Sequence, residues 1–295
     1  MVVVDAIGDT HPMIHGTLAD LTALLSLEAL GTGRFVTAPC SGSRWRVYGG
    51  QFLGQGLIAA THDGELPVRS FHAYFIRAGD ATQPMYYEVE RSSDEHRFVR
   101  AHQENKLLFT MEVALGEYGS APVIPMPHVP GPEACIPREK GVQNLDADTE
   151  STWAVVDSPF DNRFVENIWH DMPAPPRHHV WFRTRRSSVP DNLSPMQVRH
   201  MRQAVLAYYA DDTIMDNALF PHGWSGSWER LQTTSLDHAM WFHADIPLDT
   251  WLLHAQDSPA AGGGRGMTRG LIYRPSGELV ASAAQEILMR PNTSQ

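Results

Sequence analysis

Two segments of the chain share one pattern: His72-Ala73-Tyr74-Phe75-Ile76-Arg77-Ala78 and His238-Ala239-Met240-Trp241-Phe242-His243-Ala244. Each begins with His-Ala and continues with aromatic and apolar residues of the kind enriched in strands. Upstream of them, Gln55-Gly56-Leu57-Ile58-Ala59 matches Gln203-Ala204-Val205-Leu206-Ala207. Agreement in both residue identity and element order favours an internal repeat over coincidence in short windows.

The first copy combines helices with a series of short strands. Leucines at helical spacing predict a helix over residues 17–30, with a capping box in Thr17-Leu18-Ala19-Asp20 and with Gly31 and Gly33 at its end. A second helix is expected to open with Gly49-Gly50-Gln51. Aromatic and β-branched residues predict successive antiparallel strands over 68–77, 85–91, 97–102 and 107–115.

A proline-rich stretch separates the two copies. Prolines crowd residues 122–137, so we interpret residues 119–158 as a linker between a first domain (1–118) and a second domain (159–295). Two such copies predict an α+β fold with two antiparallel sheets, each wrapped around a central helix. The copies are expected to pair, because a sheet edge and face must be buried. The elements expected in the second copy are a strand over 179–184, a helix over 194–210 with Ser194 as N-cap, and strands over 232–243, 250–256, 267–274 and 279–289.

The composition excludes several classes of protein. The net charge of −11 argues against a protein that coats a nucleic-acid duplex, and the cluster of Arg183, Arg185 and Arg186 is interpreted as a solvated strand edge. No apolar run approaches the ~20 residues that span a membrane. The chain ends match neither a secretory signal nor the Ser-Lys-Leu peroxisomal address, so a cytoplasmic location is expected. Cys40 and Cys135 are too few for a disulfide framework or a thiolate zinc cage, and we interpret them as ordinary thiols.

Two further patterns suggest chemistry but have simpler interpretations. Fifteen histidines invite a metal hypothesis, yet no HExxH spacing occurs, and His238 and His243 should face opposite sides of one strand. No metal site is therefore predicted. Gly223-Trp224-Ser225-Gly226-Ser227 lacks the G-x-S-x-G pattern of a nucleophile elbow and is interpreted as a loop. Gly262-Gly263-Gly264-Arg265-Gly266 lacks a nucleotide-binding spacing and is interpreted as a turn near the ligand cleft.

Several motifs together cover about residues 17–290. They include Arg46-Val47-Tyr48-Gly49-Gly50-Gln51, Ser70-Phe71-His72-Ala73-Tyr74-Phe75-Ile76-Arg77-Ala78-Gly79-Asp80, Asp237-His238-Ala239-Met240-Trp241-Phe242-His243, Trp251-Leu252-Leu253, Arg265-Gly266 with Arg269-Gly270, and Gln285-Glu286. On these motifs the sequence resembles the type II acyl-CoA thioesterase family, whose members have a double hotdog fold. The resemblance implies hydrolysis of fatty acyl-CoA to free fatty acid and CoA, without a cofactor or a covalent intermediate.

The resemblance also implies the catalytic residues. An aspartate after the second central helix, a strand hydroxyl and a glutamine on the last strand fall on Asp211, Ser235 and Gln285; the family frequently has threonine where this chain has Ser235. The adjacent Asp212 offers a second carboxylate, and the count back from Asp237 favours Asp211. Asp211 would be the general base that deprotonates water, while Ser235 and Gln285 orient the water or polarise the carbonyl.

Substrate-binding groups are expected at two places. The helix start at Gly49, Gly50 and Gln51 would bring backbone N–H groups and the helix dipole to a negative charge. Arg265 is the second expected substrate contact. The hairpin at 92–97 is shorter than is usual in the family, which could alter the CoA groove or an oligomer contact. Proteins of this family often assemble further, so homo-oligomers are one expectation.

The repeat predicts that only the second half is catalytic. The positions aligned with Asp211, Ser235 and Gln285 are Asp63, Arg69 and a site near Val113. Two alternatives stay open: a non-catalytic acyl-CoA or lipid-binding protein of the same fold, and a hotdog enoyl-CoA hydratase. Retention of all three side-chain types argues against the first alternative. The second would need an Asp/His pair in the cleft, for which no matching segment is found.

Overall fold

The structure, a computed structural model, describes seven segments of the chain. They are residues 16–38, 46–119, 124–142, 158–168, 172–185, 192–224 and 231–291. Both chain ends, Cys40, residues 143–157 of the predicted linker, Arg186 and Ser225-Gly226-Ser227 lie outside the described residues.

The helices and strands alternate much as the repeat predicts. The first half contains α1 (Leu18–Leu25), β1 (Glu28–Gly31), β2 (Arg34–Val36), α2 (Gly49–Ala60), β3 (Val68–Phe75), β4 (Tyr86–Arg91), β5 (His96–Gln103) and β6 (Lys106–Leu115). Between the halves lie η1 (Pro132–Ala134), β7 (Ile136–Pro137) and α3 (Arg138–Val142). The second half contains β8 (Phe160–Phe164), β9 (Arg177–Thr184), α5 (Pro195–Ala210), α6 (Asp216–Leu219), η2 (Phe220–His222), β10 (Leu231–Ser235), β11 (Asp237–Phe242), β12 (Leu252–Gly262), β13 (Arg265–Tyr273) and β14 (Leu279–Pro291).

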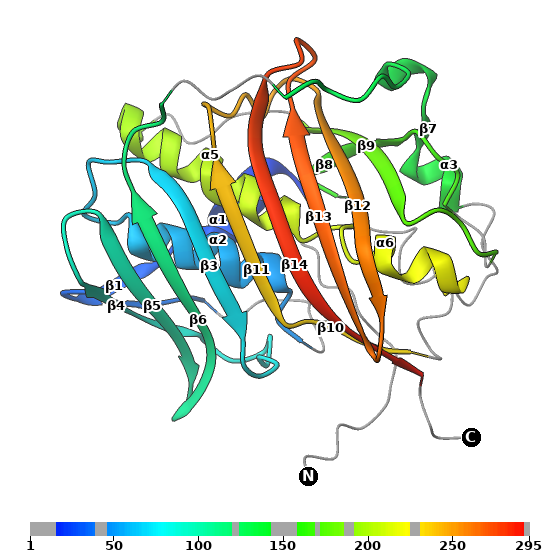
Figure 1. The fold of residues 1–295 in the computed structure, drawn as a ribbon. Helices are drawn as coiled ribbons and strands as arrows, with labels where there is room; N and C mark the ends of the chain where they lie inside the picture. Colours follow the sequence, from blue (N-terminus) through cyan, green and yellow to red (C-terminus); the bar gives the residue numbers. More distant parts are fainter. Residues whose placement is uncertain are drawn as a thin grey trace.

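The strands form one broad antiparallel sheet, and the long helices α2 and α5 lie together behind it (Figure 1). The strand order is β1-β2-β4-β5-β6-β3-β11-β14-β13-β12-β9-β8-β7, with β10 beside β14. One long helix for each set of strands is the arrangement expected of a double hotdog. The two sheets expected from the sequence are joined edge to edge into a single 14-stranded sheet.

The junction of the two halves is made by the repeated segments themselves. β3 and β11 pair antiparallel, with Asp237 opposite Tyr74 and Trp241 opposite Ser70. This pairing confirms the expectation that the copies pair. It also explains the single sheet, because the strand edge that each half would otherwise expose finds its hydrogen-bond partners in the other copy.

The two long helices pack closely because glycines line the contact. A Cβ atom on Gly50 would overlap the carbonyl oxygen of Tyr208, and one on Gly54 would lie 3.0 Å from the carbonyl oxygen of Ala204. The start of α2 therefore lies against the end of α5. Ser194 caps the other end of α5 with a capping box, as predicted.

The first helix is shorter than predicted. Its capping box at Thr17 is present, but α1 ends at Leu25, and the C-cap Ser26 donates both its backbone N–H and its hydroxyl to the carbonyl oxygen of Thr22. Residues 28–30, predicted as the end of this helix, belong instead to the edge strand β1, and Gly31 and Gly33 turn the chain into β2 with positive φ angles of 137° and 66°. The leucine spacing was misleading here, because strand pairing overrode a weak local helix preference.

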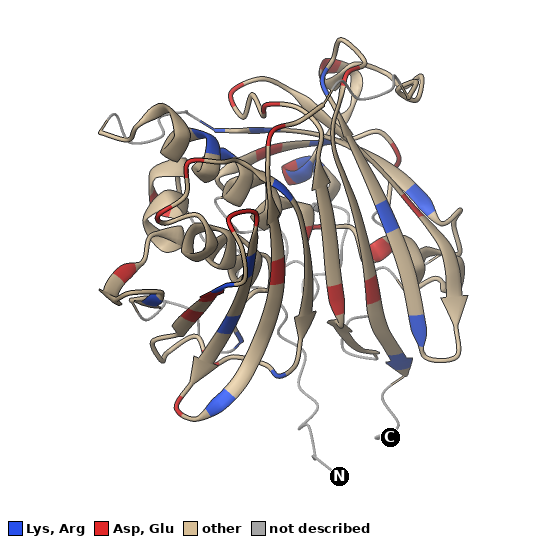
Figure 2. Cartoon of the chain, turned by 60° about the vertical axis from the view of Figure 1, so that its left-hand side comes forward, with Lys and Arg blue, Asp and Glu red and all other residues tan. Residues whose placement is uncertain are grey.

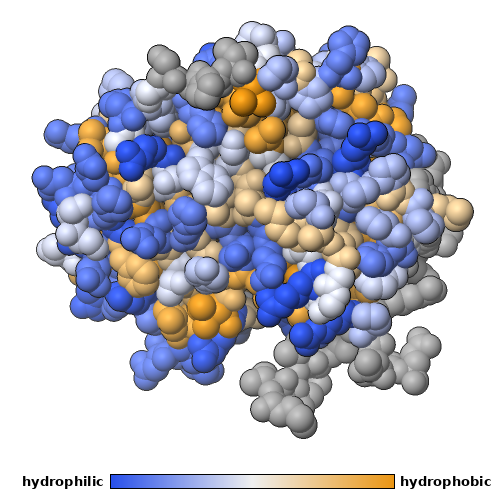
Figure 3. All heavy atoms as spheres, viewed as in Figure 1, coloured by the Kyte–Doolittle hydropathy of each residue, from blue (hydrophilic) through white to orange (hydrophobic). Residues whose placement is uncertain are grey.

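On the sheet face, apolar side chains of the described residues form small groups between hydrophilic ones (Figure 3). Acidic and basic residues lie interspersed along the strands (Figure 2). Among the described residues, no helix combines the length and apolar character needed to cross a membrane.

Candidate functional site

Three side chains predicted from the sequence meet behind the sheet. Asp211 is the C-cap of α5, Ser235 ends β10, and Gln285 lies within β14. The Ser235 hydroxyl donates to Asp211 Oδ1 over 3.2 Å, and Gln285 Nε2 donates to Ser235 Oγ over 2.7 Å. The three residues are only 5%, 9% and 1% exposed. A carboxylate, a hydroxyl and an amide from distant parts of the chain are thus linked by hydrogen bonds.

An interruption of the strand at Leu236 directs the side chain of Ser235 into this cluster. The strand predicted over 232–243 is two strands, β10 and β11, separated at Leu236. The N–H of Leu236 donates to Glu286 O, and its carbonyl oxygen accepts from Phe75 N, so it bonds to both neighbouring strands. In a regular strand Ser235 and His238 would face opposite sides, since they are three residues apart. The break places both side chains in the interior, where each is buried.

The surroundings of Asp211 make it a stronger base than an ordinary aspartate. Burial raises the pKa of Asp211 to about 6, and the negative charge of Asp212 adds to the rise. Hydrogen bonds from Ser235, the backbone N–H of Gly50 and Gln285 act in the opposite direction. A general base whose pKa approaches the working pH suits proton transfer, because much of it is ionised and it still binds a proton well.

The start of α2 holds this carboxylate through its backbone. Gly50 N–H is one of the free donors at a helix N-terminus, where the helix dipole favours negative charge. A Cβ atom on Gly49 would lie 2.5 Å from Asp211 Oδ2, so glycine is needed for the approach. The N–H of Gln51 bonds to Tyr48 O. Two of the N–H groups that the sequence assigned to substrate binding therefore have partners within the protein.

The neighbouring Asp212 has a different role from Asp211. Its carboxylate forms a buried ion pair with Arg138 at 2.8 Å, and Arg138 comes from α3, within the segment interpreted as a linker. The next residue, Thr213, has a φ of 63° and a hydroxyl that accepts from Gln256 Nε2 over 2.9 Å. A β-branched residue in the left-handed region is strained. The ion pair of Asp212 with Arg138 and the hydrogen bond from Gln256 stabilise this turn.

Two residues of the site were missed by the sequence analysis. His238, for which the sequence predicts no role in a site, is fully buried and places Nδ1 2.7 Å from Gln285 Oε1 and 4.0 Å from Asp211 Oδ1. Its place in the Asp-His-x-Met-Trp-Phe-His motif was a usable signal. Arg138 gave no signal, because its segment has no periodicity to show that it folds back onto α5.

The other predicted residues lie apart from this cluster. Arg265 is exposed and forms an ion pair with Glu286 at 2.5 Å. In the first half, the side chain of Asp63 is 83% exposed and lies 3.8 Å from His62, Arg69 is exposed, and Val113 is buried in the core. Hence the positions aligned with the three clustered residues do not form a second cluster.

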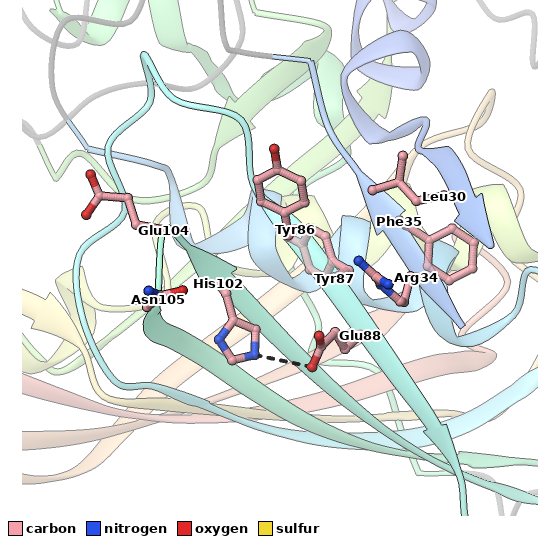
Figure 4. A pocket seen from close by; sticks show the side chains of 9 residues that line it. All are labelled: Leu30, Arg34, Phe35, Tyr86, Tyr87, Glu88, His102, Glu104 and Asn105. Atoms are coloured by element: carbon pink, nitrogen blue, oxygen red, sulfur yellow. Dashed lines mark ion pairs between the residues drawn. The ribbon is translucent and has the colours of Figure 1, made fainter. Parts of the chain in front are cut away.

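A pocket of about 410 Å³ lies in the first half, between β1, β2, β4 and β5 (Figure 4). The residues that line it are Leu30, Arg34, Phe35, Tyr86, Tyr87, Glu88, His102, Glu104 and Asn105. It shares no residue with the Asp211 cluster, and its His102 lies 3.8 Å from Glu88. Within the described segments, no group of three histidine, cysteine, aspartate or glutamate side chains is arranged to hold a metal ion.

Comparisons with known proteins agree across the whole chain. Residues 165–288 match the family model described as acyl-CoA thioesterase, and residues 37–114 match that of the acyl-CoA thioesterase N-terminal domain. Human acyl-coenzyme A thioesterase 8 is 31% identical over 99% of this chain and 94% of its own length. Acyl-CoA thioesterase 2 of Haemophilus influenzae is 30% identical over 83% of this chain and 88% of its own. The crystal structure of an acyl-CoA thioesterase II, TesB2, from Mycobacterium marinum is 32% identical, with a TM-score of 0.72 over 94% of this chain and 99% of that one.

Proposed function

Because the chain belongs to the type II acyl-CoA thioesterase family and hydrolyses acyl-CoA thioesters, we propose that Asp211, Ser235 and Gln285 activate the attacking water directly. Support comes from their convergence: hydrogen bonds of 3.2 and 2.7 Å link the three groups in the interior. The bond from Ser235 to Asp211 is the longer one and exceeds the usual 2.5–3.0 Å for O–H···O. A water that enters the cluster would most easily replace this bond.

In the proposed reaction, Asp211 takes a proton from the water as its oxygen attacks the thioester carbonyl carbon. Ser235 fixes the water, and the Gln285 amide donates to the oxygen that becomes negative. The tetrahedral intermediate then collapses, the C–S bond breaks, and the departing thiolate takes the proton from Asp211. The products are the free acid and CoA, and the base returns to its starting state.

The aromatic residues beside Asp211 support a fatty acyl chain as the acyl group of the substrate. A Cβ atom on Gly49 would lie 3.3 Å from the ring of Phe75, beside the position of Asp211 Oδ2. Phe75 in turn packs against Phe52 and Phe109, with ring centroids 6.3 and 5.5 Å away. An apolar wall next to the base favours a hydrocarbon chain and excludes bulk water from the reaction.

Substitution at the cluster tests the assignment of the base. Asp211→Asn is expected to lower kcat about 10²- to 10⁴-fold, the usual contribution of a general base, measured by thiol release from acyl-CoA substrates of increasing chain length. The matched control is Asp63→Asn, which changes the exposed first-half counterpart and should leave kcat as in the wild type. The assignment is wrong if Asp211→Asn keeps at least half the wild-type kcat.

A single turnover in water enriched in oxygen-18 tests the direct attack. If water attacks the thioester, the heavy oxygen enters the product acid in the first turnover. If Asp211 itself attacked and formed an anhydride, water opening that anhydride at the aspartyl carbon would place the label in the enzyme and an unlabelled oxygen in the acid. Unlabelled acid from the first turnover would therefore contradict the proposal.

The sequence left two alternatives open, a non-catalytic binding protein and an enoyl-CoA hydratase. Membership of the thioesterase family argues against both, because its activity is thioester hydrolysis. Substrate contact by Arg265, a cytoplasmic location and assembly into homo-oligomers stay predictions from the sequence. So does the division into a non-catalytic first domain, a linker and a catalytic second domain.

A further inference from the structure

His238 contacts the proposed catalytic cluster from β11. Its Nδ1 atom lies 2.7 Å from Gln285 Oε1, and the side chain is completely buried. One face of its ring stacks near Phe71, with centroids 6.0 Å apart. Its Nε2 atom is buried and has no hydrogen-bond partner among the described residues. In the part of the chain that the structure describes, Gln285 Oε1 is therefore the one polar atom within hydrogen-bond distance of the ring, and Asp211 Oδ1 lies farther away, 4.0 Å from Nδ1.

The hydrogen bonds around Gln285 fix which nitrogen of His238 carries the proton. The carboxylate of Asp211 can only accept, so Ser235 donates to it and itself accepts from Gln285 Nε2. The amide oxygen Oε1 then faces His238, and Nδ1 donates to it. Nε2 of His238 is then unprotonated, which fits its buried position, because an orphaned N–H costs more than an unused acceptor. Burial lowers the pKa of His238 to about 4, so the ring is neutral near neutral pH.

The bond from His238 supports one direction along the whole chain of bonds. With Oε1 held by His238, Nε2 of Gln285 faces Ser235 and donates to its oxygen. Ser235 then keeps its own proton for Asp211. With the amide turned over, Gln285 would present its oxygen to Ser235, and the hydroxyl would donate to the amide instead of the carboxylate.

We propose that His238 is a positioning residue of the thioesterase: its Nδ1–H orients the amide of Gln285 and, through it, the hydroxyl of Ser235 toward Asp211. The inference rests on the proposed role of these three residues in hydrolysis. His238 does not contact the water or the substrate in this scheme. It acts by favouring one of the two orientations of the Gln285 amide, the one in which Nε2 donates to Ser235.

Two substitutions separate the N–H donor from the volume of the ring. His238→Phe keeps an aromatic ring but removes the donor, and we expect kcat to fall about 10- to 100-fold with little change in KM, as for a misplaced reacting group. His238→Asn places an amide N–H close to the position of Nδ1 and should restore most of kcat. The control is His243→Asn, one residue beyond the end of β11, where the histidine is only partly buried and bonds to Ser282. This control should keep wild-type kcat.

A double-mutant cycle distinguishes positioning from a general effect on the fold. If His238 acts through Gln285, adding His238→Phe to Gln285→Ala should lower kcat by no more than about twofold, which is the scatter expected even when two effects are independent. A full further loss in the Gln285→Ala background would overturn the proposal. So would a His238→Phe variant with wild-type kcat, or a His238→Asn variant as impaired as His238→Phe.

The protonation of His238 can be tested without any activity. In the wild-type protein labelled with nitrogen-15 histidine, NMR should show Nδ1 protonated and Nε2 unprotonated at neutral pH, and Gln285→Ala should perturb that signal. A protonated Nε2 would refute the inference even if every variant failed to fold. Because this readout does not depend on hydrolysis, it stands if Asp211→Asn stays active and the proposed mechanism fails.

Discussion

Replacing Asp211 with asparagine is expected to raise the unfolding free energy, relative to the wild type, more at high pH than at low pH. The folded protein raises the pKa of this carboxyl from 3.8 to about 6 by burying it. Two pKa units at about 1.4 kcal/mol each amount to about 3 kcal/mol. The side chain is almost fully buried, so solvent screening does not reduce this figure appreciably.

The sign follows from where the proton binds. Below about pH 4 the carboxyl is protonated in both the folded and the unfolded chain, so there is no penalty. Between about pH 4 and pH 6 the unfolded chain loses the proton first, and the folded state becomes progressively less stable. Above about pH 6 the full penalty of about 3 kcal/mol is present, and at about pH 5 roughly half of it. Asparagine carries no charge and avoids this penalty.

The comparison must be made at two pH values. The amide of asparagine would place an N–H group against Ser235 or Gly50, and such a mismatch costs about 1–3 kcal/mol at any pH. This constant cost cancels when the gap in unfolding free energy between variant and wild type is compared at two pH values. We expect the unfolding free energy of Asp211→Asn, relative to wild type, to rise by about 1–2 kcal/mol between about pH 5 and about pH 8.

Urea unfolding followed by tryptophan fluorescence gives the required free energies, since the chain has 8 tryptophans. Asp63→Asn serves as the control, and its gap should be the same at both pH values because that carboxylate is exposed. A gap for Asp211→Asn that stays constant or shrinks as the pH rises would refute the reasoning. The carboxyl would then not be destabilised by its surroundings in the folded protein.

Three further outcomes are expected. Arg138→Ala leaves the buried Asp212 unpaired and should lower the unfolding free energy by about 3–5 kcal/mol, whereas Arg269→Ala breaks an exposed pair and should cost about 0–1 kcal/mol in the same urea assay. Gly49→Ala forces a methyl group against the carboxylate of Asp211 and should lower kcat at least about tenfold. Gly56→Ala in the same helix meets only side-chain atoms at 3.3 Å and is the matched control; equal losses of kcat in the two variants would contradict the reasoning. For the wild type, kcat/KM should fall as the pH drops below about 6, because Asp211 becomes protonated, and a profile flat down to about pH 4 would exclude it as the base.

Much of the fold could be predicted because its signals are local or repeated. The cap at Ser194 and the strand periods are read within a few residues, and the matching segments at 72–78 and 238–244 indicated two similar units. The pairing of those segments followed from the need to bury sheet edges. The edge strand at 28–31 could not be predicted, because its residues favour helix and only pairing with β2 makes them a strand.

The candidate site was predictable where a motif carried it and not elsewhere. Asp211, Ser235 and Gln285 came from a resemblance and proved to be neighbours. Their mutual hydrogen bonds, however, depend on the break at Leu236, which turns Ser235 inward and has no marker in the sequence. Arg138 was beyond sequence reasoning, since an ion pair between residues far apart in the chain leaves no periodic pattern.

The contact between the start of α2 and Asp211 constrains how the two halves can diverge. The exposed side chains of Asp63 and Arg69 in the first half do not reach this carboxylate, so we expect their substitution to leave hydrolysis unchanged. The backbone of the first half at Gly49 and Gly50 has no such freedom, since it provides both a donor and the space for that group. Gly49 and Gly50 should therefore tolerate substitution poorly, although neither has a side chain to lose. A second half produced alone would keep Asp211, Ser235 and Gln285 but would lack the backbone of α2 that contacts the base.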